Sequence, residues 1–420
     1  MRYLVIALCF IISLSGNAQD RIMESSRPYI HTFETMEADV LKNFVRAIAK
    51  DKTIIGLGEV SHYTKECYEL KHQIISVLME QGFDGLVLEV DFGQALLWND
   101  YVLHGKGDLD TLVAGSAWFT YRTEEFKNLL LDIRKHNLLG KAPFQIYGME
   151  MTAVSNNIDW LKKYIRFAEV KADDLLELLS EERKNIAFQN YNESEVRDYW
   201  ELYYSANQFL QKHENLLMEK DSVSFSVALR ITEIFRQFAT YISQDEFYLQ
   251  VELRDLFSTR NVMWALEEQN KNRQLVLWAH NGHVTKESVV YGYDVLGHYL
   301  QQRLGEQYYG IGFTFNEGSF GSFGPDGFGK WTLPRETNIS FTTAFAAFES
   351  PYLVFDIKQN LENDRDTQSL LRKPFQIRTD ISESYNLNQT TLMEINLSKT
   401  YDALIYIEKT SFPTTIDWIR

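Results

Sequence analysis

Short apolar runs recur along this chain of 420 residues, and most of them are followed by a stretch with helical spacing. The runs are continuous, which is typical of strands covered on both faces, whereas strands with one wet face alternate. They predict an α/β fold whose mostly parallel central sheet is flanked by helices. The expected strands cover residues 53–57, 85–90, 144–147, 275–279, 309–315, 352–357 and 403–407.

One long stretch, about residues 156–270, contains neither glycine nor proline and is rich in Glu, Lys, Leu and aromatic residues. Apolar residues recur at helical spacing in its segments 174–186, 194–217 and 223–242, which predicts a large helical insertion in a domain covering 20–420. Its aromatic side chains are expected in the helix packing rather than in a ligand cage. They are exemplified by Trp200, Tyr203, Tyr204 and Phe209.

Residues 316–337 are dense in glycine and also carry large aromatic side chains. Glycine clusters predict a loop, and a loop of this length is either functional or an ordinary connection. Two readings therefore stay open, a plain surface connection and a mobile lid over an apolar substrate. The aromatic residues are Phe320, Phe323, Phe328 and Trp331.

The N-terminus has the pattern of a secretory signal peptide, assigned to residues 1–19. A basic residue is followed by an apolar run that is too short to span a bilayer and by small residues that end at Ala18. We therefore expect a secreted or periplasmic protein with no stable membrane insertion after cleavage. Cys9 lies inside the apolar run, so a lipid-anchored cysteine is a minor alternative. Removal of the signal leaves Cys67 as the only cysteine, which excludes an intramolecular disulfide.

The chain is strongly acidic, with a formal net charge of −16. This charge opposes binding to nucleic acid and to anionic membrane surfaces. A small molecule is the expected partner, and the oligomeric state is not predicted by the sequence.

The first expected strand leads into a segment that combines a carboxylate with an imidazole. Glu59 and His62 follow the strand directly, and Thr64 can cap the next helix, whose apolar face is formed by Cys67, Leu70, Ile74 and Leu78. Ligands of open α/β sheets bind where strands end at their carboxyl side. This segment is therefore the first candidate for catalysis.

Three further strands end in polar or ionisable residues. They place Glu89, Glu150 and the group His280, Asn281 and His283 at or near their carboxyl ends. A carboxylate buried on an apolar strand needs a partner, and histidine is a natural one. We expect these groups to converge with Glu59 and His62 on one cleft.

The segments GLGEVSH, KECYELKH, GLVLEVDF, TYRTEEF, IYGMEM, RDLFSTRN, VLWAHNGHV, GYDVLGHYL, YYGIGFTF and NEGSF occur in this order. With them, roughly the first three quarters of the chain resembles the erythromycin esterase family, in the wider fold group that includes haem-binding ChaN-like proteins. The resemblance implies a carboxylic ester or lactone hydrolase, with macrolide-like compounds among its candidate substrates and a role in macrolide resistance. It further implies water activated by a histidine and no serine acyl-enzyme. We expect no cofactor and no metal, because no HExxH or paired-cysteine signature fixes a metal site.

Carried over by position, the resemblance gives each site residue a role. His62 would be the general base, oriented by Glu59 and Glu89, while His280 and His283 would bind the substrate carbonyl or oxyanion. The residues implied to contact the substrate are Lys71, Arg122, Glu150, Arg254 and Asn281.

The chain departs from the family pattern at three positions. Lys71 stands where arginine is usual, Tyr63 where glycine is common, and Glu150 where aspartate is usual. A lysine keeps the positive charge of arginine but loses its bidentate fork. These changes concern substrate positioning more than the base.

Two alternatives stay open on the sequence. A divalent-metal hydrolase is one, because Glu59, His62, Glu89, His280 and His283 offer nitrogen and oxygen ligands. The other is a non-enzymatic binder of haem or another small ligand, in which two facing histidines would hold iron.

Overall fold

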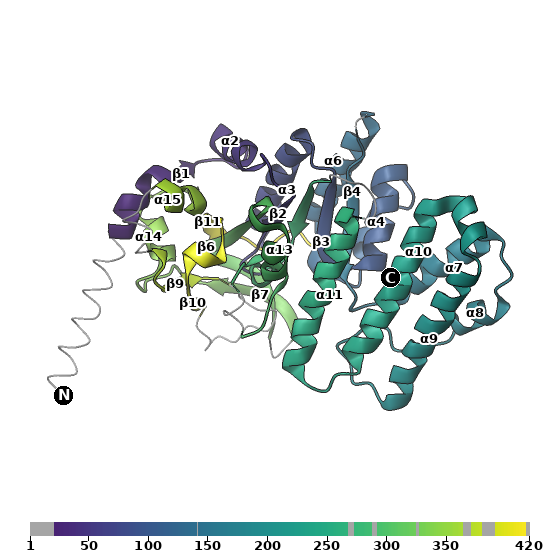
Figure 1. Cartoon of the computed structure of the whole chain (residues 1–420). Coiled ribbons are helices and arrows are strands. Elements are labelled where there is room, and N and C mark those ends of the chain that lie inside the picture. The colour runs from purple at the N-terminus through teal and green to yellow at the C-terminus, as the bar shows by residue number, and fades with distance from the viewer. Residues whose placement is uncertain are drawn as a thin grey trace, which may run out of the picture. The chain divides into compact units, whose positions relative to one another are not determined.

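The computed structural model describes residues 21–140, 142–267, 273–287, 292–324, 327–363, 371–379 and 391–416. The predicted signal peptide, residues 1–19, lies outside the described residues. The chain divides into two compact units (Figure 1). The first unit comprises Met1–Phe83, Val113–Asp132 and Val276–Arg420, and the second comprises Asp84–Leu112 and Ile133–Leu275.

The first unit is built on a mixed sheet with the strand order β1-β8-β11-β6-β2-β5, to which β7 adds on β6. At its centre β11 and β2 both run parallel to β6, whereas β8 is antiparallel to β11 and to β1. The strands are β1 (Ile30–Phe33), β2 (Ile54–Leu57), β5 (Leu275–Trp278), β6 (Tyr308–Gly324), β7 (Gly327–Leu333), β8 (Tyr352–Asp356) and β11 (Ala403–Thr410).

Helices accompany these strands along the chain. Those of this part of the chain are α2 (Asp39–Ile48), α3 (Lys65–Glu80), α6 (Glu124–Leu138), α12 (Asn281–Val284), α13 (Leu296–Leu304), α14 (Phe341–Ala346), α15 (Ile357–Asn363) and α17 (Leu397–Thr400). The predicted apolar face of α3, with Cys67, Leu70, Ile74 and Leu78, is fully buried. Helix α2 is also amphipathic, and its buried residues are Leu41, Phe44, Val45 and Ile48.

The second unit contains a parallel strand pair and a group of long helices. Strands β3 (Gly85–Asp91) and β4 (Gln145–Glu150) pair in parallel. The helices are α4 (Phe92–His104), α7 (Ser155–Ala168), α8 (Asp173–Leu178), α9 (Glu193–Lys212), α10 (Glu214–Ile242) and α11 (Phe247–Glu267). Figure 1 shows α7 to α11 as one helical group, which is the large helical insertion expected from the sequence.

The predicted fold class, α/β with a mostly parallel sheet and a helical insertion, is confirmed. Each predicted strand coincides with an observed one, because a continuous apolar run has few other ways to bury both of its faces. The strands that the sequence did not predict are short, alternating or glycine-rich: β1, β7, β9 (Phe375–Arg378) and β10 (Leu392–Ile395).

Two helix predictions in the insertion were wrong in extent. The helix expected over 174–186 ends at Leu178, and Ile186 instead pairs with Ala153 in an isolated antiparallel bridge. The segment 194–217 is divided at His213 between α9 and α10. Of the aromatic residues expected in the packing, Trp200, Tyr203 and Phe209 pack against the apolar core, whereas Tyr204 is exposed.

The prediction of a loop over residues 316–337 was wrong, because most of this segment forms the end of β6 and the antiparallel strand β7. Two of its glycines, Gly318 and Gly321, mark close approaches to neighbouring segments. Gly318 has a φ of +127°, and a Cβ there would lie 2.1 Å from the Thr410 carbonyl oxygen. A Cβ on Gly321 would lie 2.5 Å from the Tyr63 Cβ. These two glycines therefore let the β6–β7 hairpin lie close to Thr410 and Tyr63.

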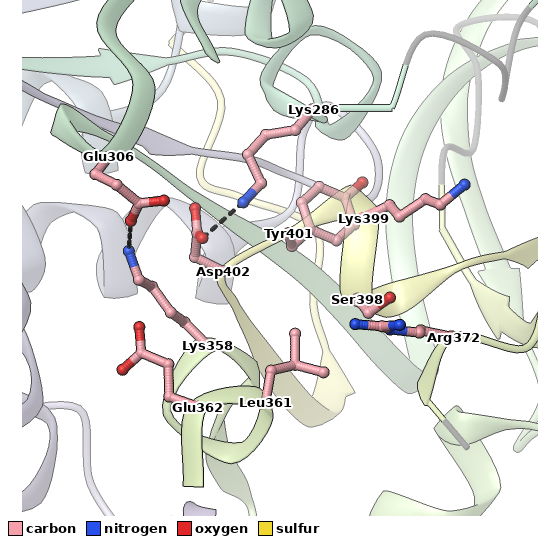
Figure 2. A pocket seen from close by; sticks show the side chains of 10 residues that line it. All are labelled: Lys286, Glu306, Lys358, Leu361, Glu362, Arg372, Ser398, Lys399, Tyr401 and Asp402. Carbon is pink, nitrogen blue, oxygen red and sulfur yellow. Dashed lines mark hydrogen bonds and ion pairs between the residues drawn. The ribbon is translucent and has the colours of Figure 1, made fainter. Parts of the chain in front are cut away.

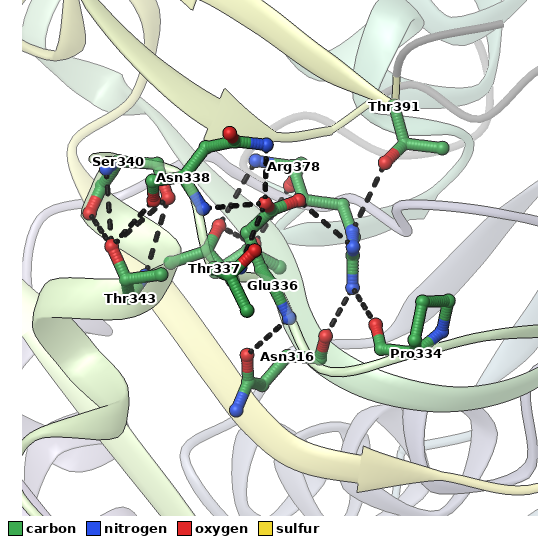
Figure 3. A network of polar contacts seen from close by, with 11 residues as sticks. Asn316, Pro334, Glu336, Thr337, Asn338, Ser340, Thr343, Arg378 and Thr391 are labelled. Atoms are coloured by element: carbon green, nitrogen blue, oxygen red, sulfur yellow. Dashed lines mark hydrogen bonds and ion pairs between the residues drawn. The ribbon is translucent and has the colours of Figure 1, made fainter.

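The base of the β6–β7 hairpin is held by a buried arginine, Arg378, at the end of β9 (Figure 3). Its guanidinium donates to Glu336 Oε2 (2.9 Å), to the Asn316 carbonyl and to Thr391 Oγ1 (3.1 Å). The Glu336 N–H in turn donates to Asn316 Oδ1 (3.2 Å). Because one rigid fork serves several acceptors, this network fixes where the hairpin leaves the sheet.

Among the described residues, no helix is both long and apolar enough to cross a lipid bilayer.

We expect Gly318→Ala to lower the free energy of unfolding by about 2–4 kcal/mol, because a side chain at this φ is strained and also meets the Thr410 backbone. The matched control is Gly329→Ala on β7, where a Cβ would meet nothing within 4 Å. Urea unfolding measures both variants. Equal stability of the two variants would contradict the close-approach account.

Candidate active site

The loop between β2 and α3 carries the first two candidate residues, Glu59 and His62. It can pass close to its neighbours because Gly58 has no side chain: a Cβ there would lie 2.2 Å from Asn281 Oδ1. The Gly58 N–H also donates to the Ile311 carbonyl (2.8 Å), which continues the pairing of β2 with β6 beyond the strand. The loop is therefore held at the carboxyl end of a parallel strand, where ligands of α/β sheets bind.

Helix α3 begins after Thr64, as expected, but the predicted side-chain cap is wrong. The Thr64 hydroxyl contacts Ser61 Oγ (2.8 Å) instead of a helix N–H. The hydroxyl thus closes the loop that holds His62 rather than the end of the helix.

Glu59 is buried and its two carboxylate oxygens have different partners. Oε2 accepts from Lys71 Nζ (2.6 Å) and from the Trp278 indole N–H (3.0 Å), while Oε1 contacts His62 Nδ1 (2.5 Å). Burial alone would raise the pKa of Glu59, but Lys71 and His62 outweigh it and lower the pKa to about 2. Glu59 is therefore ionised at neutral pH.

The ionised state of Glu59 fixes the tautomer of His62. A carboxylate can only accept hydrogen bonds, so Nδ1 of His62 must be the donor in their contact. In the neutral imidazole the lone pair then lies on Nε2. The His62 side chain is 12% exposed, so it lies near the protein surface while its carboxylate partner is buried.

Lys71 differs from its predicted role as a substrate contact. Its side chain is completely buried, its ammonium is paired with Glu59, and it lies 4.4 Å from the centre of the Trp278 ring. An ammonium in such a site is stabilised by its counter-charge and by the face of the indole ring. We correct the assignment: Lys71 supports Glu59 from within the protein.

Trp278, the last residue of β5, was not predicted as a site residue. A buried indole N–H requires an acceptor, and here the acceptor is the Glu59 carboxylate. A tryptophan two residues before His280 on an apolar strand is the sequence signal that could have indicated this contact.

His280 follows β5 and lies next to His62, with ring centroids 5.1 Å apart. Its Nδ1 accepts from the Gly282 N–H at the start of α12 (3.4 Å). The neutral ring with this tautomer carries its proton on Nε2 and can donate a hydrogen bond from there. The structure thus brings together the two histidines that the strand-end pattern singled out.

Asn281 and His283 lie on α12, directly after His280. Asn281 is completely buried, and its side chain accepts from the Phe313 N–H (3.0 Å) and donates to the Phe313 carbonyl (2.8 Å). These bonds join the His280 segment to β6, so Asn281 has a structural role here, and its substrate contact stays a prediction. His283 is half-buried, and its N–H donates to the His280 carbonyl (2.9 Å).

In the second unit, Arg254 on α11 joins two predicted site carboxylates. Its guanidinium lies 2.9 Å from Glu89 Oε1 and 2.7 Å from Glu150 Oε1. Glu150 is fully buried and Glu89 nearly so, so the arginine offsets two desolvated charges. Their convergence with Glu59 and His62 on one cleft, and their contact with substrate, stay predictions.

Arg122, another predicted substrate contact, lies in the first unit. Its Nε donates to the Ser116 carbonyl (2.8 Å), which orders the segment that precedes α6. Among the residues that the structure describes, no group of three or more His, Cys, Asp or Glu side chains could hold a metal ion.

A cavity of about 560 Å³ lies elsewhere in the first unit (Figure 2). Ion pairs cross it, from Lys286 to Asp402 (2.6 Å) and from Lys358 to Glu306. Asp402 directly precedes β11, so this cavity is at the amino end of that strand, whereas Glu59 and His62 follow the carboxyl end of β2. Ligands of α/β sheets bind at carboxyl ends, so we do not place the reaction in this cavity.

Comparison with known proteins relates most of the chain to one family. Residues 78–410 match the family model described as erythromycin esterase. Erythromycin esterase type II of Escherichia coli is 21% identical over 413 residues, covering 87% of this chain and 92% of that protein.

Solved structures share the fold. A Bacillus cereus protein has a TM-score of 0.81 at 24% identity, covering 95% of this chain and 99% of that one. A mutant of erythromycin esterase EreC in its open conformation has a TM-score of 0.65 at 17% identity, covering 92% and 99%.

The low pKa of Glu59 predicts a specific acid sensitivity. A carboxyl that titrates at 4.5 when unfolded and about 2 when folded contributes stability above pH 4.5, which is lost as the pH falls toward 2. The free energy of unfolding of the wild type should therefore fall more steeply over this range than that of Glu59→Gln. Urea unfolding at pH 7, 5, 4 and 3 measures this difference, and parallel curves would contradict it.

Removing the charge of Lys71, the partner of Glu59, should destabilise the protein. We expect Lys71→Met to lower the free energy of unfolding by about 3–5 kcal/mol, because it leaves a buried carboxylate without its counter-charge. Lys65→Met on the same helix is the control, since Lys65 forms an exposed pair with Glu69 and its removal should change stability by less than about 0.5 kcal/mol. The double variant Glu59→Gln/Lys71→Met should recover part of the loss; additive losses would contradict the pairing.

Proposed function

Because the chain belongs to the erythromycin esterase family, we propose that this hydrolase cleaves a carboxylic ester or lactone with water activated by His62. The observation that carries the proposal is the arrangement of Glu59, His62 and His280. The carboxylate lies 2.5 Å from one nitrogen of His62, and the second histidine ring lies 5.1 Å from that of His62. A base, its orienting carboxylate and a hydrogen-bond donor are the groups that direct hydrolysis requires.

In the proposed reaction, Nε2 of neutral His62 takes a proton from water while the water oxygen attacks the carbonyl carbon. The carbonyl oxygen becomes an oxyanion, to which His280 donates from its Nε2–H. When the intermediate collapses, the bond to the alcohol oxygen breaks and protonated His62 returns its proton to the leaving alkoxide. The products are an acid and an alcohol, or one hydroxy acid when the substrate is a lactone.

Glu59 supports this cycle through its charge. It holds the tautomer in which Nε2 is the base, and its negative charge stabilises the imidazolium that forms after proton transfer. Lys71 and Trp278 keep the carboxylate ionised and oriented. Macrolides are one candidate group among the esters and lactones.

The test is a panel of activated esters, lactones and macrolides. His62→Ala should lower kcat by roughly 10²- to 10⁴-fold with KM nearly unchanged, the range expected for a lost general base. His72→Gln is the matched control, because His72 lies on α3 and pairs with Asp132 (3.1 Å). Full activity of His62→Ala would refute the mechanism.

A chelator separates the proposal from the metal-dependent alternative. Activity should be unchanged by chelator. If chelator abolishes activity and zinc or manganese restores it, the histidines and carboxylates act as ligands and the metal hydrolase reading replaces ours.

A further inference from the structure

Three segments that are far apart in the sequence converge on the loop of His62. The β6–β7 hairpin reaches it through the Gly321 N–H, which donates to the Tyr63 carbonyl (3.2 Å). The C-terminal segment reaches it through Ser411, whose carbonyl accepts from the Lys65 N–H (3.0 Å). The segment before α6 reaches it at Arg122, whose carbonyl accepts from the Tyr63 hydroxyl (3.5 Å). All three belong to the first unit.

Each of these segments contributes a phenylalanine to the ring of Tyr63, the residue directly after His62. The ring centroids of Phe328, Phe412 and Phe119 lie 5.0, 5.3 and 5.9 Å from that of Tyr63. Phe119 and Phe328 also contact each other, with centroids 4.5 Å apart. We call these four residues the aromatic platform.

The aromatic platform presents apolar surface rather than forming a closed core. Tyr63 is buried, but Phe119, Phe328 and Phe412 are each only half-buried. Three large apolar side chains gathered around one residue in this way mark a binding surface more often than scattered exposed residues do. Because Tyr63 directly follows His62 in the same loop, we take the ligand of this surface to be part of the substrate.

The backbone of Tyr63 is held in an unfavourable conformation. Its φ of +58° is in the left-handed region, which costs free energy for any residue with a Cβ. A glycine would make this turn at lower cost, and the contacts of the Tyr63 ring with the three phenylalanines offset that cost. Gly321 allows the contact, because a Cβ on it would lie 2.5 Å from the Tyr63 Cβ.

Carboxylates fix the C-terminal part of the platform in place. Both oxygens of Glu66 accept from Ser411, from its N–H at 2.6 Å and from its hydroxyl at 2.5 Å. Both oxygens of Glu125 accept from the Thr414 N–H (3.1 Å). Phe412 lies between these anchors, so the platform is pre-organised and little conformational freedom is lost when it binds.

We propose that the aromatic platform binds a hydrocarbon part of the ester substrate, next to the carbonyl that His62 attacks. This inference rests on the proposed ester hydrolysis and adds the substrate class, an ester whose acyl chain is long and apolar. Flat aromatic rings suit such chains because they bury methylene groups without requiring a hydrogen bond.

The kinetic test uses 4-nitrophenyl esters from acetyl to octanoyl. For the wild type, kcat/KM should rise roughly twofold to fourfold per added methylene, the value expected for burying a methylene group partly or fully. Phe328→Ala should lower kcat/KM for the octanoyl ester by at least roughly tenfold and for the acetyl ester by less than about twofold. Phe328→Leu should restore part of the increase in kcat/KM with acyl-chain length. A variant that is merely misfolded would not show this recovery.

Phe167→Ala is the matched control, because Phe167 is an exposed phenylalanine on α7 in the second unit. It should leave the chain-length profile unchanged. If Phe328→Ala and Phe412→Ala lower all esters equally, or leave the slope as in the wild type, the platform does not bind the acyl chain and the inference is overturned.

Binding of octanoate, measured by titration calorimetry on the whole chain, separates this inference from the proposed reaction. His62→Ala should bind octanoate as the wild type does, whereas Phe328→Ala should bind it at least roughly tenfold more weakly. Octanoate binding that depends on Phe328 in a protein without esterase activity would refute the reaction but support the platform. Esterase activity that requires His62, together with octanoate binding that ignores Phe328, would refute the platform alone.

Discussion

The buried ion pair between Glu59 and Lys71 is the interaction on which the rest of the site depends. Removing two charges from water is costly, and the cost is offset here by a 2.6 Å contact, an indole N–H on the same oxygen and the face of Trp278 beneath the ammonium. The pair keeps Glu59 ionised, and an ionised carboxylate dictates which nitrogen of His62 carries the proton. The tautomer of a partly buried histidine is thus set, through Glu59, by a lysine whose side chain is completely buried.

Much of the fold could be predicted from the sequence, because strands covered on both faces leave a continuous apolar run that needs no knowledge of neighbours. The β6–β7 hairpin could not. Glycine occurs both in turns and at close contacts between backbone segments. For Gly318 and Gly321, the nearby positions of Thr410 and Tyr63 show that these are close contacts. Thr410 and Tyr63 lie far from these glycines in the sequence, so composition alone predicted a loop.

The candidate site, too, could be predicted from the sequence only in part. Glu59, His62 and His280 were predicted because each follows a recognisable strand, and the structure places them together. Lys71 was assigned to the substrate, although it lies four residues after Cys67 on the buried face of α3, a position where a lysine requires an internal partner. That partner, and the contact from Trp278 across 219 residues, depend on tertiary structure.

The anchoring of Ser411 by Glu66 spans 345 residues, and this separation has a consequence for how the protein is made. A ribosome synthesises the loop of His62 early and adds Phe412 roughly tens of seconds later, at the usual speed of translation. Long-range contacts of this kind form late, after the intervening chain has been closed into a loop. During biosynthesis Glu59 and His62 are therefore made long before Phe412, so a chain that ends before residue 411 carries the proposed base without the complete aromatic platform.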